Sequence, residues 1–579
     1  MTLQTSSAKS HPVSNFLWFT LKKQTPITLL ATAFILMLCP GMLFKEIFDS
    51  YEHNYGSNTI QLISGDQASF GLLIYIAGLA VMFLLLLINF GFLFSKKSSD
   101  MYQALPVTRN EMLVVRGFSS FVGGLFAATL PYAGMGIAGC MPYVEGMGIA
   151  QYIIGYLLLV LFIAISTAIT TLIIICCGGY FDTFVALGSV TLFPIVLMAI
   201  FFNVTESIAT GITFGPNPIV YTSPYLYMGS SLYSYLLPDY YTFYHFNSSA
   251  PITVWGIIFL VVLGCLAAFA ASKLYGRRKS EKAGEAYAFK FVSAAIGIMV
   301  SVAGGWIIGW IFSDNSNGLS AAFWLFFIIG ALLSSMTVGV IMSRGFKTVK
   351  SSLIRGGVAS ALALVLTVTA VFSAMGAETY VPNPKGVKAV GVDLIYKEDV
   401  VIKDNPEIIT DIHKTVVKNI KEGKNYADEE MSPLLRGVSS IGFTYRLKSG
   451  IIVEREYSAH YYAGDKSLYE PYLKYLKCDE RLTALKRCFE SERESGRVGI
   501  SYYPENATDK EYTADLTQEQ ANKLYELYKS EIEELTTAAF DKSVFKIHIS
   551  GEVYVTLLIP EDCTATQSYV KSFLFPEEP

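Results

Sequence analysis

Residues 153–177 read IIGYLLLVLFIAISTAITTLIIICC, a run without an Asp, Glu, Lys, Arg or His. A bilayer core needs about 20 consecutive apolar residues per helix, and backbone amides inside it must be paired within the segment. The run therefore predicts a transmembrane helix. Together with eight similar runs it predicts spans at 26–44, 71–94, 118–138, 153–177, 184–202, 252–272, 291–312, 321–342 and 357–375.

The composition of the whole chain agrees with a membrane protein. Of its 579 residues, 52% are hydrophobic and 16% are charged, whereas about 25% are charged in typical soluble proteins. Residues 1–375 contain 18 Lys and Arg residues and 13 acidic residues. Residues 376–579 contain 26 Lys and Arg residues and 35 acidic residues. We expect an α-helical polytopic membrane protein with about nine transmembrane helices, followed by an acidic C-terminal soluble α+β domain at 376–579.

The distribution of basic residues predicts the orientation in the cell membrane. The segments between spans form two alternating sets. One set, which includes the N-terminal segment, holds 17 Lys and Arg residues in total, and the other set, before the C-terminal domain, holds one, Lys45. Cytoplasmic connections carry the excess of basic residues in membrane proteins. The N-terminus is therefore predicted to be cytosolic, and an odd number of spans places the C-terminal domain outside the cell.

Two segments outside the spans contain aromatic residues typical of a membrane interface. Residues 1–25 contain an apolar group at 16–19 followed by Lys22 and Lys23, which predicts an interfacial helix or, alternatively, a longer first span. The connection 203–251 has eight Tyr residues from Tyr221 to Tyr244 and no Lys or Arg. It is either a re-entrant lid at the outer mouth or an ordinary loop resting on headgroups.

The C-terminal domain has the local signals of helices and hairpins. Asn405-Pro406 predicts the start of a helix that runs to about residue 420, with Gly423 beyond its end. Alternating runs at 441–457 and 545–559 predict two hairpins, and Thr517 with Gln520 predicts a capping box. His413, His460 and His548 are scattered, so no catalytic, cofactor-binding or metal-ligating residue is predicted.

The chain lacks the features that would let it supply its own driving energy. It contains no Gly-x-x-x-x-Gly-Lys-Ser/Thr sequence, and the nine apolar cores hold no ionisable group. Ion-coupled transporters usually place ionisable groups inside the membrane, because protons and ions need sites there. An uncharged path favours amphipathic or lipid-like cargo, and the energy would come from another subunit.

Segment 96–117 is the candidate for contact with such a subunit. Pro106 interrupts one stretch, and Thr108-Arg109-Asn110-Glu111 has the form of a capping box, with Thr108 as N-cap and Glu111 at N3. The helix that begins there is predicted to continue into the third span. A capped helix transmits a push that a flexible loop would absorb.

The remaining side chains of this segment are expected to meet the partner. Leu105 and Val107 offer an apolar contact, and Arg109 and Arg116 either pair with acidic residues of the partner or anchor at headgroups. Elsewhere, Gly305 and Gly309 form a Gly-x-x-x-Gly pattern in the seventh span. It brings two helices close, either between two copies or within one chain.

The sequence Leu105-Pro106-Val107-Thr108-Arg109 resembles that of the ABC-2-type permeases, the membrane subunits of bacterial ABC exporters. These often carry Leu-Pro-(Val/Ile)-(Ser/Thr)-Arg in a cytosolic coupling helix between spans two and three. Residues 1–25 resemble the family's elbow helix. Residues 277–284 resemble a segment that is common in permeases of this type from Gram-positive bacteria. Residues 445–450 resemble a hairpin found in a subset of these permeases that carries an outer domain.

The resemblance implies a domain organisation and a set of partners. A six-span transmembrane domain would occupy 26–285 and three additional spans 286–375. The implied partners are an ABC ATPase subunit that carries ATP and Mg, a second permease copy or paralogue, and membrane lipid, with no nucleic acid. The cargo would be a drug, an antimicrobial peptide or a lipid-like compound.

Two other functions remain open from the sequence. A receptor or sensor would bind an extracellular ligand through 376–579 and signal through the spans. A membrane enzyme acting on lipids would need a cluster of His, Asp or Arg at one membrane face, and the sequence indicates none. A passive membrane anchor would not need nine spans.

Overall fold

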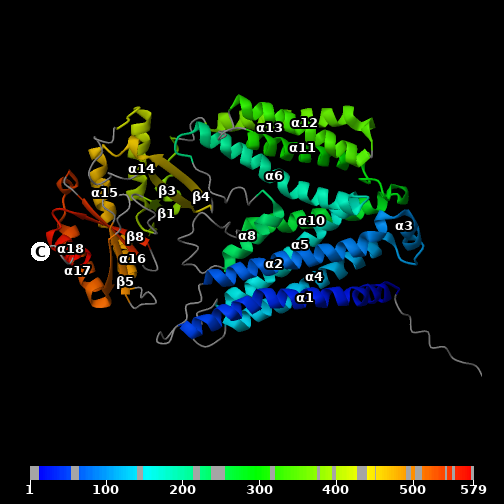
Figure 1. Cartoon of the computed structure of the whole chain (residues 1–579), viewed down its shortest axis with the longest axis horizontal. Coiled ribbons are helices and arrows are strands. Elements are labelled where there is room, and N and C mark those ends of the chain that lie inside the picture. The colour runs from blue at the N-terminus through cyan, green and yellow to red at the C-terminus, as the bar shows by residue number, and fades with distance from the viewer. Residues whose placement is uncertain are drawn as a thin grey trace, which may run out of the picture. The chain divides into compact units, whose positions relative to one another are not determined.

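The computed structural model describes residues 12–53, 64–139, 148–212, 222–236, 254–312, 320–343, 345–374, 379–393, 400–426, 440–449, 452–490, 497–502, 512–541, 544–550 and 554–575. The chain forms two compact units (Figure 1). Unit 1 contains 1–207 and 216–370, and unit 2 contains 208–215 and 371–579. The boundary predicted at 285/286 therefore lies inside unit 1.

In the described part of the chain, nine helices are long and apolar enough to span a membrane, which indicates a multi-pass membrane protein. They are α1 (Pro12–His53), α2 (Ser64–Phe90), α4 (Arg109–Gly139), α5 (Ile149–Cys176), α6 (Tyr180–Ile208), α10 (Val254–Arg277), α11 (Lys290–Phe312), α12 (Ala321–Ser343) and α13 (Val349–Ala374). Each overlaps one predicted span. The expected boundary at residue 25 falls within α1, which continues through Pro26 without a break.

The long helices pack around two separate apolar clusters. The larger cluster joins α1, α2, α4, α5 and α10, and the smaller joins α11, α12 and α13 (Figure 1). Helix α6 belongs to both, because Ala186 near its start packs in the larger cluster and Val196 and Ile200 pack in the smaller. Helix α11 also enters the larger cluster through Ile296, so the three additional spans attach to the rest of unit 1 through both α6 and α11.

The described part of the tyrosine-rich connection enters the larger cluster. Helix α8 (Pro224–Leu236) packs against α2 and α5, and Met228, Leu232 and Leu236 are fully buried. The Tyr225 hydroxyl hydrogen-bonds that of Thr170 at 2.9 Å. This burial fits an element inserted among the helices better than a loop resting on them. Residues 213–221 and 237–253 lie outside the described residues.

Gly305 and Gly309 pack inside the chain. A Cβ at Gly305 would lie 2.9 Å from the carbonyl oxygen of Phe327, and one at Gly309 would lie 3.0 Å from the Phe323 ring, both on α12. The pattern therefore allows α11 to approach α12 closely, as the intramolecular alternative expects.

We expect Gly305→Ala to destabilise unit 1 by about 1–3 kcal/mol, because the new methyl group would meet backbone that cannot move alone. Gly357→Ala on α13 is the matched control. Its Cβ would meet nothing within 4 Å, so it should be neutral or stabilising by up to about 1 kcal/mol. Thermal unfolding followed by tryptophan fluorescence measures both, and equal melting temperatures would contradict the expectation.

Unit 2 contains the same succession of elements twice. The first set is β1 (Val387–Asp393), β2 (Val401–Ile402), α14 (Pro406–Lys421), β3 (Ser440–Leu447) and β4 (Ile452–Ser458). The second is β5 (Arg497–Tyr502), β6 (Tyr512–Thr517), α17 (Gln518–Glu534), β7 (Val544–Ser550) and β8 (Tyr554–Pro560). The antiparallel sheets have the equivalent orders β2-β1-β3-β4 and β6-β5-β7-β8. Shorter helices α15 (Tyr469–Leu476), α16 (Asp479–Glu490) and α18 (Thr564–Leu574) complete the unit.

Two of the predicted helix ends in unit 2 are confirmed, whereas Asn405 precedes Pro406 at the start of α14 without a capping hydrogen bond from its side chain. Thr517 and Gln520 form a reciprocal capping box at the start of α17. At the end of α14, Gly423 has a φ of 67°, and the amide of Lys424 donates to the carbonyl of Asn419. This is a Schellman motif, in which the positive φ favours glycine.

Unit 2 also includes the residues that follow α6. The amide of Glu456 on β4 donates to the carbonyl of Gly211 at 3.1 Å, and Ile212 forms a β-bridge with Arg455. Ala209 and Ile212 share a small apolar cluster with Ala374 at the end of α13. Unit 2 is therefore joined to the ends of two long helices, α6 and α13.

Candidate functional site

Three connections of unit 1 meet at one end of the helices and form what we call the connection layer, residues 95–108, 177–179 and 278–289. Gly178 donates its amide to Ala286, Gly284 donates to Gly178, and Ala288 donates to Cys176, at 2.9–3.1 Å. Cys177 and Tyr287 form an antiparallel bridge. All three connections lie on the side that the basic residues predict to be cytosolic.

Arg278 fixes the layer to the ends of two other elements. Its Nη1 donates to the carbonyls of Ile174 and Ile175 at the end of α5, and its Nη2 donates to Leu93 at 2.9 Å in η1 (Gly91–Phe94). These carbonyls are at helix ends, where a cation is favourable. Burial lowers the pKa of the guanidinium to about 10, so it remains charged at pH 7.

The predicted capping box is present at the start of α4. The amide of Thr108 donates to Oε2 of Glu111 at 2.8 Å, and the amide of Glu111 donates to Oγ1 of Thr108 at 3.3 Å. The short helix α3 (Lys96–Gln103) precedes it, and Leu105 and Pro106 are exposed at the turn between the helices. Val107 is half-buried. The turn is therefore an exposed apolar tip on a capped helix.

Arg109 is held within the chain. Its Nη1 donates to the carbonyl of Gly276 at 3.2 Å and to that of Arg278 at 3.3 Å. These are carbonyls at the end of α10, and Ser272 of α10 also donates to Asn110. Arg109 thus links α4 to α10, and its pairing with a partner or with headgroups stays a prediction.

Arg116 is likewise enclosed by this chain, with 6% of its surface exposed. Its guanidinium carbon lies 4.2 Å from the ring centre of Phe92, 4.4 Å from that of Tyr102 and 5.6 Å from that of Phe16. Such cation–π contacts stabilise a desolvated arginine. Arg116 is therefore out of a partner's reach, whereas Leu105 and Pro106 at the turn and residues 108–111 after it are exposed.

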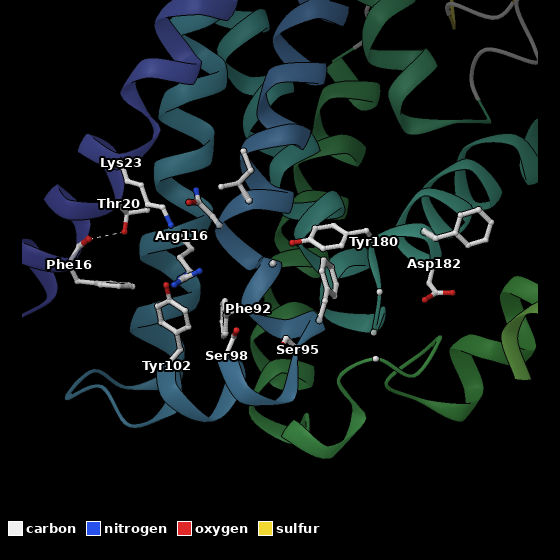
Figure 2. A pocket seen from close by; sticks show the side chains of 18 of the residues that line it. Phe16, Thr20, Lys23, Phe92, Ser95, Ser98, Tyr102, Arg116, Tyr180 and Asp182 are labelled. Carbon is white, nitrogen blue, oxygen red and sulfur yellow. Dashed lines mark hydrogen bonds between the residues drawn. The ribbon is translucent and has the colours of Figure 1, made fainter. Parts of the chain in front are cut away.

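The connection layer borders a pocket of about 740 Å³ (Figure 2). Its lining comes from α1, the end of α2, η1, α3, α4 and the α5–α6 turn. Asn89 of α2 lies at its wall and donates to Gln24 of α1 and to Ser119 and Ser120 of α4. This buried network fixes the three helices that form one side of the pocket.

The sequence placed Arg278 among the cytosolic charges and in the permease-like segment 277–284, but it gave no indication of what this side chain contacts. Its role depends on carbonyls at residues 93, 174 and 175, far away in the chain. A local feature that could have pointed to a tight turn is Gly284, six residues further along the chain, which has a φ of 83° where the chain turns back to pair with residue 178. Among the described residues, no group of three or more His, Cys, Asp or Glu could hold a metal ion.

No family model, curated protein or solved structure matches this chain. The arrangement of the site is therefore interpreted from its own geometry. The likeness of residues 105–109 to the coupling motif of ABC-2-type permeases remains a prediction from the sequence.

Proposed function

We propose that this chain is the permease subunit of an ABC exporter in a bacterial plasma membrane. A separate ATPase subunit, carrying ATP and Mg, binds the turn between α3 and α4. Two permease subunits, identical or paralogous, form the path, and amphipathic cargo crosses it outward. The observation that supports this proposal is the exposed apolar turn at Leu105 and Pro106, which precedes a capped helix that hydrogen-bonds to neighbouring helices.

The contacts of the tip support a mechanical role. Force applied at Leu105 passes along α4, because the capping box makes its first turn rigid. It also passes to α10, because the guanidinium of Arg109 donates hydrogen bonds to carbonyls at the end of that helix. Arg278 then connects the end of α10 to α5 and η1. One push at the turn therefore moves several spans together.

The apolar character of the spans supports the choice of cargo. The cores of the predicted spans hold no Asp, Glu, Lys, Arg or His, and polar groups such as Thr170 and Tyr225 hydrogen-bond one another. Such a path offers no site for a small ion but tolerates a drug, an antimicrobial peptide or a lipid-like compound.

Leu105→Asp tests the proposal. We expect its association with the copurifying ATP-binding subunit to weaken at least about tenfold, because a carboxylate would be buried in an apolar contact. Stimulation of ATP hydrolysis by the chain should fall in parallel. Leu105 is 37% exposed and makes no hydrogen bond through its side chain, so insertion and thermal stability should be unchanged.

Phe346→Asp is the matched control, since Phe346 is an 80% exposed apolar residue in the α12–α13 connection, which is also predicted to be cytosolic. It should leave ATPase association intact. Equal association of wild type and Leu105→Asp would contradict the proposed coupling. Arg109→Glu is a poorer test, because it would also break the link to α10.

A sensor is the second candidate, and the connections of unit 2 favour it. The residues after α6 pair with β4, and the end of α13 packs beside them. A ligand bound to unit 2 would thus act on two spans. Retained signalling in cells that lack the ATPase would favour the sensor, whereas ATP hydrolysis that depends on this chain favours the exporter.

A further inference from the structure

The pocket beside the connection layer has a positive end and an apolar opening. Of the described residues that line it, Lys23 and Arg116 are basic and Asp182 is acidic. Figure 2 shows Lys23 and Arg116 extending from α1 and α4 into one part of the pocket, with Asp182 on the far side beyond Tyr180. The basic end can therefore hold an anion away from the carboxylate.

Arg116 is a buried charge at the wall of the pocket, and it forms no ion pair with an acidic residue among those that the structure describes. Its Nε is buried without a hydrogen-bond partner in the described structure. The rings of Phe92 and Tyr102 cover the guanidinium and orient it. A buried donor without a partner is unfavourable, and an anion with several oxygen acceptors would satisfy it.

Further donors line the same end of the pocket. Ser95, Ser98 and Tyr102 contribute hydroxyl groups from α3 and the residue before it. A phosphate group has three or more acceptor oxygens, so basic and hydroxyl donors together suit it better than they suit a single carboxylate. The donor set therefore matches a phosphate-bearing ligand.

The opening of the pocket is apolar. Phe19 of α1 and Phe181 of α6 line the pocket with 61% and 63% of their surfaces exposed, and Ile88 of α2 also lines it. Helix α1 continues beyond Phe19 with exposed Leu29, Leu30 and Phe34. A ligand with its phosphate in the pocket would have apolar surface beside it for hydrocarbon chains.

We propose that this pocket binds the phosphate headgroup of an anionic phospholipid, with Lys23 and Arg116 as its charged contacts and its acyl chains lying along α1 and α6. Helix ends are where headgroups lie in a bilayer, and basic residues there attract anionic lipids. The proposal requires a membrane-embedded chain but no ATPase, so it is independent of the proposed exporter function. Because α3 and Arg116 line the pocket, the bound lipid would stabilise the connection layer.

Native mass spectrometry of the full chain in detergent, titrated with phosphatidylglycerol or phosphatidylcholine, tests the proposal. We expect phosphatidylglycerol to bind at least about fivefold more tightly, and Lys23→Gln to remove about fivefold of that affinity. Lys22→Gln is the matched control, because Lys22 is the next residue on α1 but does not line the pocket. It should bind like wild type.

Arg116→Lys gives a second measure, since it keeps the charge but removes the planar donor group and the Nε. We expect it to weaken phosphatidylglycerol binding without reducing phosphatidylcholine binding. Equal affinity for the two lipids, or equal losses in Lys22→Gln and Lys23→Gln, would overturn the proposal. Displacement of the lipid by excess inorganic phosphate would show that the site takes soluble phosphate compounds and would overturn its assignment to lipid.

Discussion

Arg278→Gln is expected to destabilise unit 1 by about 3–5 kcal/mol, the largest effect of any single change in the connection layer. The change removes charge-assisted hydrogen bonds to Ile174, Ile175 and Leu93, and it leaves their carbonyls buried without a strong donor. Breaking a buried charged network by removing one partner typically costs this much. A glutamine amide is too short and has too few donors to reach all three carbonyls.

Arg277→Gln is the matched control for this experiment. Arg277 is the preceding residue and is exposed, so its loss should change stability by less than about 0.5 kcal/mol. Thermal unfolding in detergent and hydrogen exchange of residues 91–95 and 173–178 provide the measurements. Arg278→Lys should lie between the two variants, because it keeps the charge without the forked donors. Similar melting temperatures for Arg277→Gln and Arg278→Gln would refute the role of Arg278.

Arg278 and Arg109 show why the site could be predicted only in part. In the sequence, a Lys or Arg at the end of an apolar run looks the same whether its side chain faces lipid headgroups or hydrogen-bonds to carbonyls of another helix. The choice depends on residues brought together by the fold, such as Leu93 and Ile175 for Arg278. The capping box of Thr108 and Glu111 was predictable because both of its partners lie within four residues.

The spans were predictable for a related reason. A backbone in lipid must form its hydrogen bonds internally, so an apolar run of sufficient length leaves a single choice of structure. Their ends were less predictable, since α2 begins at Ser64 whereas the predicted span begins at 71. Helix α8 was missed as a buried helix, because its Tyr and Ser residues look like those of an exposed loop.

The repeated arrangement of unit 2 was also only partly visible. The two hairpins were predicted from their alternating patterns, but the shared strand order depends on long-range pairings of β1 with β3 and of β5 with β7. Buried ionisable groups do not follow the repeat. The first half buries His413 of α14 between Tyr445 and Tyr457, whereas Arg481, buried near Tyr528, belongs to α16, a helix outside the repeated set.

The buried histidine makes the stability of unit 2 depend on pH. His413 lies in α14 with Nδ1 2.9 Å from the Tyr445 hydroxyl and Nε2 2.9 Å from that of Tyr457, and its ring stacks on Phe443. Burial, with a smaller effect of the Arg455 charge, lowers its pKa from 6.5 to about 3. Between these values the unfolded chain binds more protons than the folded one. The free energy of unfolding therefore falls as pH falls through this range.

We expect unit 2 to be about 2 kcal/mol less stable at pH 5 than at pH 7 from this group alone. Hydrogen exchange of residues 406–421 and 440–449 in the full chain, corrected for intrinsic rates, measures the loss. Protection should fall about thirtyfold if these amides exchange through unfolding of the first sheet. Tyr445 remains protonated over this range, because burial raises its pKa.

His413→Gln separates this histidine from the acidic residues of the unit. The amide side chain still offers a donor and an acceptor to the two tyrosines but does not titrate, so the variant should lose most of the pH dependence between 7 and 5 even if it is less stable at both. His460→Gln is the control, because His460 is exposed, and it should keep the wild-type dependence. A slope unchanged in His413→Gln would mean that other groups cause it, because no proton would then be taken up at residue 413.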